Sequence, residues 1–186
     1  SAKFTKLSRE SYMVGALARF NLNHKKLHPK AKKVAKDLHL EAPNYNPFMN
    51  TIAQAVELVH CYEHAIDTLK ELKKNGINYS EEIVVGINEK GVIPTRAGNG
   101  VGAVEVPRGI LFHNYEIDDN GIIKNANCII PTNQNINNIE YDFMKFLPEI
   151  INESRDEIRL KLEMLVRAYD PCISCSAHYL DVKFVD

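Results

Sequence analysis

The sequence predicts an α+β protein that is mostly helical and carries a small β-hairpin or sheet subdomain. Apolar residues recur at helical spacing through residues 8–75 and again through 136–168, while residues 82–132 are rich in short apolar runs and turn residues. Residues 169–186 then form a cysteine-bearing loop and a tail. With 186 residues, 45% of them hydrophobic, the chain is long enough to bury a core as one domain.

Three helices are expected in the first part of the chain. Residues 10–21 place their apolar side chains on one stripe. Pro29 suits the first turn of a lysine-rich helix over residues 30–40. The longest helix should cover residues 50–74 and end at the following Asn-Gly pair.

This long helix carries potential metal ligands. His60 and His64 have the i, i+4 spacing of a metal pair, but no H-E-x-x-H pattern accompanies them, so a packing role is favoured. Cys61 is expected to be a small buried hydrophobic residue.

The central part of the chain is expected to form strands. Residues 83–87 and 91–94 are short apolar runs, and residues 96–102 are predicted to form a flexible glycine-rich loop. This loop contains G-x-G without the strand-turn-helix context of a dinucleotide site, so close approach to another backbone is favoured over phosphate binding.

A β-hairpin should follow. Strands over residues 102–117 and 122–132 flank an Asn-Gly turn. We expect the outer ends of this hairpin to meet, which places the guanidinium of Arg108 and the hydroxyl of Thr132 at the rim of one pocket.

Two further helices are predicted over residues 136–147 and 153–168, with Pro148 between them. Pro171 should push Asp170 into an extended conformation, so the chain leaves the last helix there. The loop that follows contains Asp170-Pro171-Cys172-Ile173-Ser174-Cys175-Ser176-Ala177-His178. Two thiols and an imidazole at three-residue spacing are ligands for a transition metal, although C-x-x-C alone also occurs in zinc sites and redox loops.

Composition excludes several classes of protein. The formal net charge is -1, which gives no basis for binding nucleic acid or an anionic membrane surface. The apolar runs are too short to span a bilayer. Four cysteines without a secretion signal favour reduced thiols and a cytoplasmic location over a disulfide framework.

Three segments together resemble the large subunit of nickel-iron hydrogenases. D-P-C-x-x-C-x-x-H at residues 170–178 resembles its C-terminal signature. V-P-R-G at residues 106–109, with a strand ending in Pro-Thr, resembles its E-A-P-R-G motif and the following Pro-Ser/Thr. Residues 12–23 resemble its V-G-x-L-A-R-x-N segment, particularly in cytoplasmic members coupled to nicotinamide, deazaflavin or disulfide acceptors. The resemblance implies the C-terminal part of the large-subunit fold.

The resemblance also implies a function: reversible heterolytic cleavage of dihydrogen at a thiolate-bridged nickel-iron centre whose iron carries carbon monoxide and cyanide. Cys172 would be a terminal nickel ligand and Cys175 a thiolate that bridges nickel and iron. Arg108 would lie above the open coordination position and be held there by Asp170, so these two residues are the catalytic candidates.

Other residues of the site follow from the same resemblance. Thr132 and the backbone near Pro131 would hold a cyanide ligand, while Val106 and Pro107 would form an apolar wall. Val106 stands where alanine is common, so this wall is bulkier and could alter gas access.

The resemblance further implies a magnesium or similar ion near the C-terminus of the mature subunit. His178 would bind this ion, and the main-chain carbonyl of Cys128 would be a further ligand. Residues 179–186 resemble an extension that an endopeptidase removes from many members after nickel insertion. The sequence leaves open whether that removal occurs here.

The family takes its other two nickel cysteines from an N-terminal R-x-C-x-x-C region that this sequence lacks. The chain is therefore expected to be a C-terminal fragment. Its implied partners are the missing N-terminal half, an iron-sulfur small subunit, maturation factors, the endopeptidase and dihydrogen. Because half a ligand set loses much of the binding free energy, the isolated fragment should carry no nickel-iron centre and be inactive.

Two other functions compete with this interpretation. A small zinc-binding interaction domain could use Cys172, Cys175 and His178. A thioredoxin-like protein is disfavoured because its cysteine pair would begin a helix, whereas this pair follows one. The related quinone-reductase subunits lack the cysteine pair.

Overall fold

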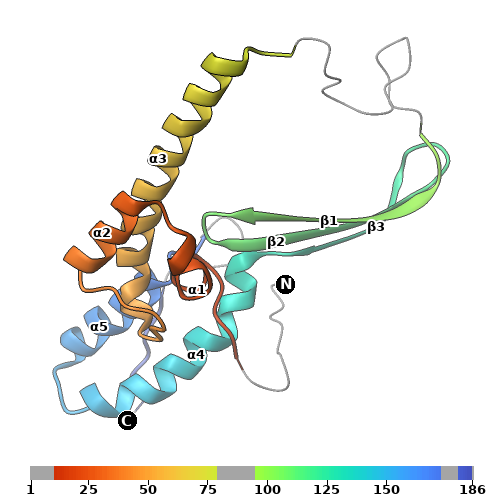
Figure 1. Cartoon of the computed structure of the whole chain (residues 1–186). Coiled ribbons are helices and arrows are strands. Elements are labelled where there is room, and N and C mark those ends of the chain that lie inside the picture. Colours follow the sequence, from red (N-terminus) through yellow and green to blue (C-terminus); the bar gives the residue numbers. More distant parts are fainter. Residues whose placement is uncertain (1–10, 79–94, 173–179, 186) are drawn as a thin grey trace.

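The computed structural model describes residues 11–78, 95–172 and 180–185. The described part has the predicted α+β composition. Its helices are α1 (Ala16–Asn23), α2 (Pro29–Asp37), α3 (Asn50–Asn75), α4 (Pro131–Ile150) and α5 (Arg155–Ala168), with short 3-10 turns at His24–Lys26 and Pro47–Met49. Figure 1 shows a three-stranded sheet that projects from the helical part, and the upper half of α3 extends beyond α1 and α2.

Two apolar clusters hold the helices together. In the first, α1 and α2 pack on the first half of α3, where Leu17, Ala31 and Val56 are almost fully buried. Ala31 lacks a long side chain, which lets α2 approach α3 closely. In the second, buried Ile150 and Leu162 join α4 to α5, and alternate residues of the C-terminal tail pack against them. These tail residues are Leu180, Val182 and Phe184.

The structure shifts the ends of the first two helices. Helix α1 begins at Ala16, because Gly15 has φ 116°, outside the helical region. The predicted start at Glu10 lies outside the described residues. Helix α2 ends at Asp37, short of the predicted residue 40, and His39 has φ 55°. Helix α3 is confirmed, ending one residue beyond the predicted span.

The sheet has one strand more than the predicted hairpin. Strands β1 (Gly98–Val106), β2 (Gly109–Ile117) and β3 (Ile123–Ile129) pair antiparallel in sequence order. The predicted glycine-rich loop therefore belongs mostly to β1. The predicted continuous strand over residues 102–117 is also wrong, because Gly109 with φ 135° closes a tight turn at its middle. The Asn-Gly turn is confirmed.

The predicted strands at residues 83–87 and 91–94 lie outside the described residues. Among the described residues, β1 and β3 bury little of their surface: Val101 is 69% and Ile123 is 56% exposed. An apolar sheet face left open in this way is typical of a surface that another part of a protein covers.

The last two helices also differ from the prediction. Helix α4 begins at Pro131, five residues early, because proline at the first helical position has no N–H to leave unpaired. It continues through Pro148, which lies in its last turn and costs few helical hydrogen bonds. Helix α5 starts with a capping box of Ser154 and Glu157, and these hydrogen bonds lower the pKa of the Glu157 carboxyl. No helix in the described ranges is long and apolar enough to cross a bilayer.

Candidate functional site

The cysteine-bearing loop leaves α5 through a sharp reversal. The N–H of Asp170 donates to the carbonyl of Arg167 at 2.9 Å, and Asp170 has φ 49°. The predicted helix exit is confirmed, but the predicted extended conformation of Asp170 is wrong. Aspartate tolerates the left-handed region better than most residues. The reversal carries the chain back toward the sheet, with Cys172 two residues further on.

Arg108 and Asp170 meet in the structure. Nε of Arg108 donates to the carbonyl oxygen of Asp170 at 2.8 Å, and Nη2 donates to Oδ1 of its carboxylate at 3.1 Å. Nε2 of Gln54 on α3 donates to Oδ2 at 3.0 Å. Both carboxylate oxygens are thus engaged, and the guanidinium is fixed by two bonds. The contact expected from the sequence is present, and its catalytic role stays a prediction.

The turn that carries Arg108 is anchored by Arg19 on α1. Nη1 of Arg19 donates to the carbonyl of Val106 at 3.1 Å, and Nη2 donates to the carbonyl of Pro107 at 2.8 Å. Glu57 binds the same guanidinium through two contacts of 2.7 Å, and Glu105 is a second acidic partner. These contacts, with Glu57 the larger cause, raise the pKa of Arg19. The V-G-x-L-A-R-x-N segment includes Arg19, but it does not signal this contact, because Arg19 lies almost ninety positions before the carbonyls it holds.

Thr132 contacts the same loop from the other side. The N–H of Cys172 donates to Oγ1 of Thr132 at 3.1 Å, and Thr132 is 4% exposed. Nε2 of Gln134 donates to the carbonyl of Ile110 at 2.7 Å, so the start of α4 lies beside the start of β2. Arg108 and Thr132 therefore both contact residues 170–172.

The first turn of α4 is buried although it is polar. Asn133 is 7% exposed, and its Oδ1 has no hydrogen-bond partner among the described residues. Asn135 is satisfied by Val14, which donates its N–H to Oδ1 at 2.8 Å and accepts from Nδ2 at 3.2 Å. Buried polar groups are normally paired, so the oxygen of Asn133 marks a place that the described residues leave incomplete.

Tyr169 anchors the start of the loop to α4. Its hydroxyl donates to Oδ2 of Asp142 at 2.5 Å and accepts from Nδ2 of Asn138 at 2.6 Å, and the residue is 3% exposed. Burial, followed by the bond to Asp142, raises the pKa of Tyr169 well above its ordinary value of 10.0. The loop residues are thus tied to α4 through a buried hydroxyl.

We expect Tyr169→Phe to destabilise the chain at neutral pH by about 1 to 3 kcal/mol, the cost of leaving buried partners unpaired. Because the folded-state pKa of Tyr169 is raised, the native state keeps the phenolic proton up to a higher pH than the unfolded state does. The free energy of unfolding of the wild type should therefore fall as the pH rises above about 10. The variant should lack this pH-dependent loss of stability. Urea denaturation at pH 7 and in steps above pH 9 measures both effects.

Tyr45→Phe is the matched control, since Tyr45 is 84% exposed. We expect this substitution to change the free energy of unfolding by no more than about 0.5 kcal/mol. Equal stability of the Tyr169 variant and the control would show that the buried network does not hold the loop.

The structure describes only some of the other predicted site residues. Cys175 and His178 lie outside the described residues. Cys128 lies on β3 with its thiol exposed. Cys61 is exposed on α3, so its predicted burial is wrong. Nδ1 of His60 accepts the N–H of His28 at 3.1 Å.

No metal site appears at the histidine pair of α3. Within residues 11–78, 95–172 and 180–185, no group of three or more His, Cys, Asp or Glu side chains could hold a metal. The packing role expected for these histidines stays a prediction.

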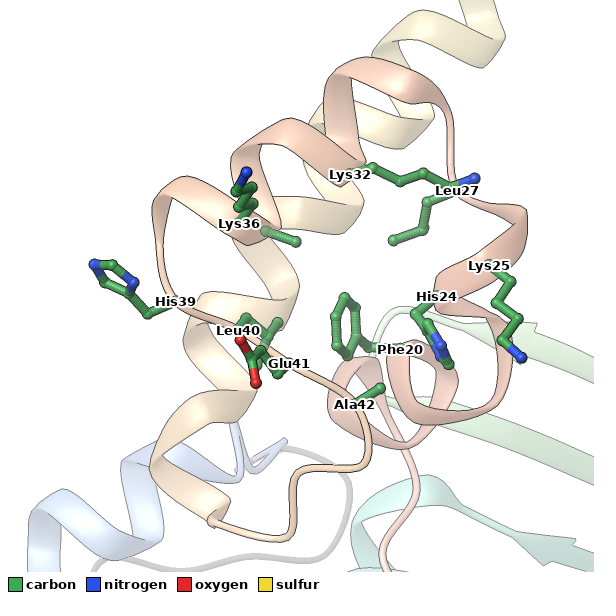
Figure 2. Close-up of a pocket in the computed structure, with 11 residues that line it drawn as sticks. Phe20, His24, Lys25, Leu27, Lys32, Lys36, His39, Leu40, Glu41 and Ala42 are labelled. Atoms are coloured by element: carbon green, nitrogen blue, oxygen red, sulfur yellow. The ribbon is translucent and has the colours of Figure 1, made fainter.

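A cavity of about 760 Å³ lies between α1, α2 and the segment that follows α2. Figure 2 shows the ring of Phe20 pointing into it, with lysine side chains at its edge. None of the residues that line this cavity belongs to the predicted site. The contacts of Arg108 and Cys172, and not this cavity, define the candidate site.

Comparisons with known proteins agree on one family. The family model described as nickel-dependent hydrogenase matches residues 3–178. The alpha chain of sulfhydrogenase 1 from Pyrococcus furiosus is 35% identical over 178 residues, which cover 95% of this chain and 39% of that one. One component of the F420-non-reducing hydrogenase from Methanothermobacter thermautotrophicus is 35% identical over 179 residues, which cover 91% of this chain and 35% of that component.

Solved structures give the same result. An NAD+-reducing NiFe hydrogenase in the H2-reduced state aligns with a TM-score of 0.65 and 26% identity, covering 90% of this chain and 36% of that chain. A NiFeSe hydrogenase from D. vulgaris Hildenborough aligns with a TM-score of 0.57 at 20% identity, covering 93% of this chain and 37% of that chain, which supports the fold alone. The chain thus spans about two fifths or less of the length of these relatives.

Proposed function

Because the chain belongs to the nickel-dependent hydrogenase family, we propose that it supplies the C-terminal part of a large subunit that reversibly cleaves dihydrogen. The motif-based assignment to this family, and to its C-terminal portion, is confirmed. The activity itself belongs to the whole enzyme. The observation that supports it most is the convergence of Arg108 and Thr132 on the loop that carries Cys172.

Cys172 and Cys175 would hold the nickel-iron centre, with carbon monoxide and cyanide on the iron. Thiolate is a soft ligand suited to such a metal, and the loop is placed beside the N-terminus of α4. When bound, the centre supplies the redox-active metal pair that splits dihydrogen. A thiolate- and cyanide-rich group is anionic, and the guanidinium of Arg108 and the positive end of the α4 dipole both favour negative charge at this place. The donor set therefore fits the group.

The surrounding residues would orient and shield this centre. Arg108, fixed by Asp170, would present an oriented positive charge to the centre, which acts most strongly once the rest of the large subunit excludes water from this site. The hydroxyl of Thr132 accepts from Cys172, which leaves its own proton available for a cyanide nitrogen. Val106 and Pro107, held by Arg19, would form the apolar wall.

The remaining parts of the proposal concern partners. The N-terminal part of the same large subunit would supply the other two cysteines, and an iron-sulfur small subunit would carry electrons. Maturation factors and an endopeptidase would load the metals and trim the tail. A magnesium or similar ion would bind His178 and the carbonyl of Cys128. We place the assembly in the cytoplasm, as for the family group whose motifs it shares.

The test uses the assembled enzyme, purified without oxygen and analysed for nickel, iron and hydrogen-dependent dye reduction. Cys172→Ala should remove nickel and lower hydrogen oxidation by at least about 100-fold, since even changes in outer-shell partners cost roughly 10- to 100-fold. Cys61→Ala is the matched control, because Cys61 is an exposed thiol on α3. Full activity in the Cys172 variant would refute the proposal. One equivalent of zinc and no hydrogen oxidation in the wild type would favour the zinc-binding domain.

A further inference from the structure

We infer that His113, Tyr115 and Cys128 form a separate metal site on the sheet, suited to a borderline-soft divalent cation such as Zn²⁺. This site lies outside the nickel-iron proposal and shares no side chain with it. Its evidence is the strand register, the spacing of three donor atoms and their exposure.

Strand geometry brings the three side chains to one face. His113 and Tyr115 are two positions apart on β2, so their side chains point to the same side of the sheet. Cys128 on β3 is the direct cross-strand partner of His113. Opposite residues in an antiparallel pair lie on the same face, so the thiol joins the imidazole and the phenol.

The donor atoms are spaced as ligands of one metal. Nδ1 of His113 lies 3.0 Å from the hydroxyl oxygen of Tyr115 and 3.4 Å from Sγ of Cys128, and the oxygen and sulfur are 3.8 Å apart. The corners of a triangle with these sides lie about 2 Å from its centre. A metal just above that plane falls within the range of zinc bonds, about 2.0 to 2.3 Å.

The chemistry of the three groups fits this metal. Zinc prefers sulfur and nitrogen ligands and accepts oxygen, usually in a four-coordinate arrangement. The thiol of Cys128 would lose its proton to solvent as the sulfur-metal bond forms, and neutral His113 would bind through Nδ1. The Tyr115 oxygen would be the third ligand and water the fourth. No redox change is needed.

The site is accessible and partly preorganised. In the chain by itself, Cys128 is exposed and Tyr115 is 37% exposed, so a metal can enter from solvent. The His113 and Tyr115 rings are stacked with centroids 5.7 Å apart and 20° between their planes, which restricts both side chains. The thiol on the sheet face is also distinct from the carbonyl of Cys128, because strand carbonyls lie along the sheet toward neighbouring strands.

The test is a Co²⁺ titration of the full 186-residue chain with Cys172→Ser and Cys175→Ser, so that those two thiols cannot contribute. We expect one equivalent of Co²⁺ to give a thiolate-to-cobalt absorption band, which Zn²⁺ then displaces. His113→Ala should weaken binding by at least about tenfold, and Cys128→Ser should abolish the band. Cys61→Ser, the matched exposed thiol, should leave it unchanged.

Two results would overturn the inference: a band that survives Cys128→Ser, or an affinity unchanged by His113→Ala. Far-UV circular dichroism of each variant shows whether the sheet is retained. If Cys128→Ser alters the sheet, Cys128→Ala gives a second thiol-free chain, and persistence of the band there contradicts the site equally.

Discussion

Replacing Arg108 by lysine in the assembled enzyme is expected to lower the turnover number for hydrogen oxidation by roughly 100-fold, because displacing a positioned catalytic group by about 1 Å can cost that much in rate. The nickel and iron contents should stay unchanged. The guanidinium makes two bonds at a fixed angle, from Nε to the Asp170 carbonyl and from Nη2 to its carboxylate. A lysine ammonium is a single flexible point charge and cannot reproduce this fork.

The matched control is Arg167→Lys. Arg167 lies on α5 close to the loop in sequence, and its 63% exposed side chain pairs with Glu163 one helical turn away. This change should leave turnover within about twofold, because exposed pairs contribute little. Dye-reduction kinetics and metal analysis on the same samples separate the two variants. An unchanged turnover number for the Arg108 variant would remove this residue from the mechanism.

Asn50→Leu is expected to have the largest effect on stability, about 3 kcal/mol. Leucine has the same branched shape as asparagine but leaves two buried groups unpaired, at about 1 to 3 kcal/mol each. Oδ1 of Asn50 accepts the N–H of Leu17 at 3.0 Å, and Nδ2 donates to the carbonyl of Ala168 at 2.9 Å. The first N–H groups and last carbonyls of a helix have no partner within that helix. One 3% exposed amide therefore caps α1 and α5 together.

Urea denaturation of the 186-residue chain measures this effect. Asn75→Leu, at the exposed end of the same helix, should change the free energy of unfolding by no more than about 0.5 kcal/mol. Because Ala168 lies two residues before Asp170, we also expect the Asn50 variant of the assembled enzyme to lose turnover. Equal stability of the two variants would show that the shared cap contributes little.

Local signals in the sequence were sufficient to predict the elements that are determined by neighbouring residues. The span of α3 was predicted closely because a long periodic stretch ends at Gly76, whose φ of 79° suits glycine. The turn at Gly121 followed from its Asn-Gly pair. Both features are decided within a few residues of the chain.

Features that depend on distant partners could not be predicted in the same way. The tight turn before Gly109 separates β1 from β2, and no Asn-Gly or Asp-Gly pair signals it. Gly109 is required there because an added Cβ would lie 2.6 Å from the side chain of Val14, far away in sequence. Arg19 and Asn50 look like ordinary helix residues in the sequence, yet each holds backbone groups of a remote element.

The candidate site was predicted in part, and by motif resemblance more than by pattern. The contacts of Arg108 with Asp170 and of Thr132 with Cys172 lie where the two motifs were expected to meet. The conformation of Asp170 was predicted wrongly, because the helix exit overrides the usual preference of a residue before proline. The metal-binding roles of Cys172, Cys175 and His178 remain predictions.

A crystal structure of the complete, metal-loaded large subunit tests the central claim most directly. We predict that Sγ of Cys172 and Sγ of Cys175 bind the nickel-iron centre, and that the Arg108 guanidinium faces its open position while still bonded to Asp170. A structure in which these sulfurs and this guanidinium face separate cavities would contradict the account.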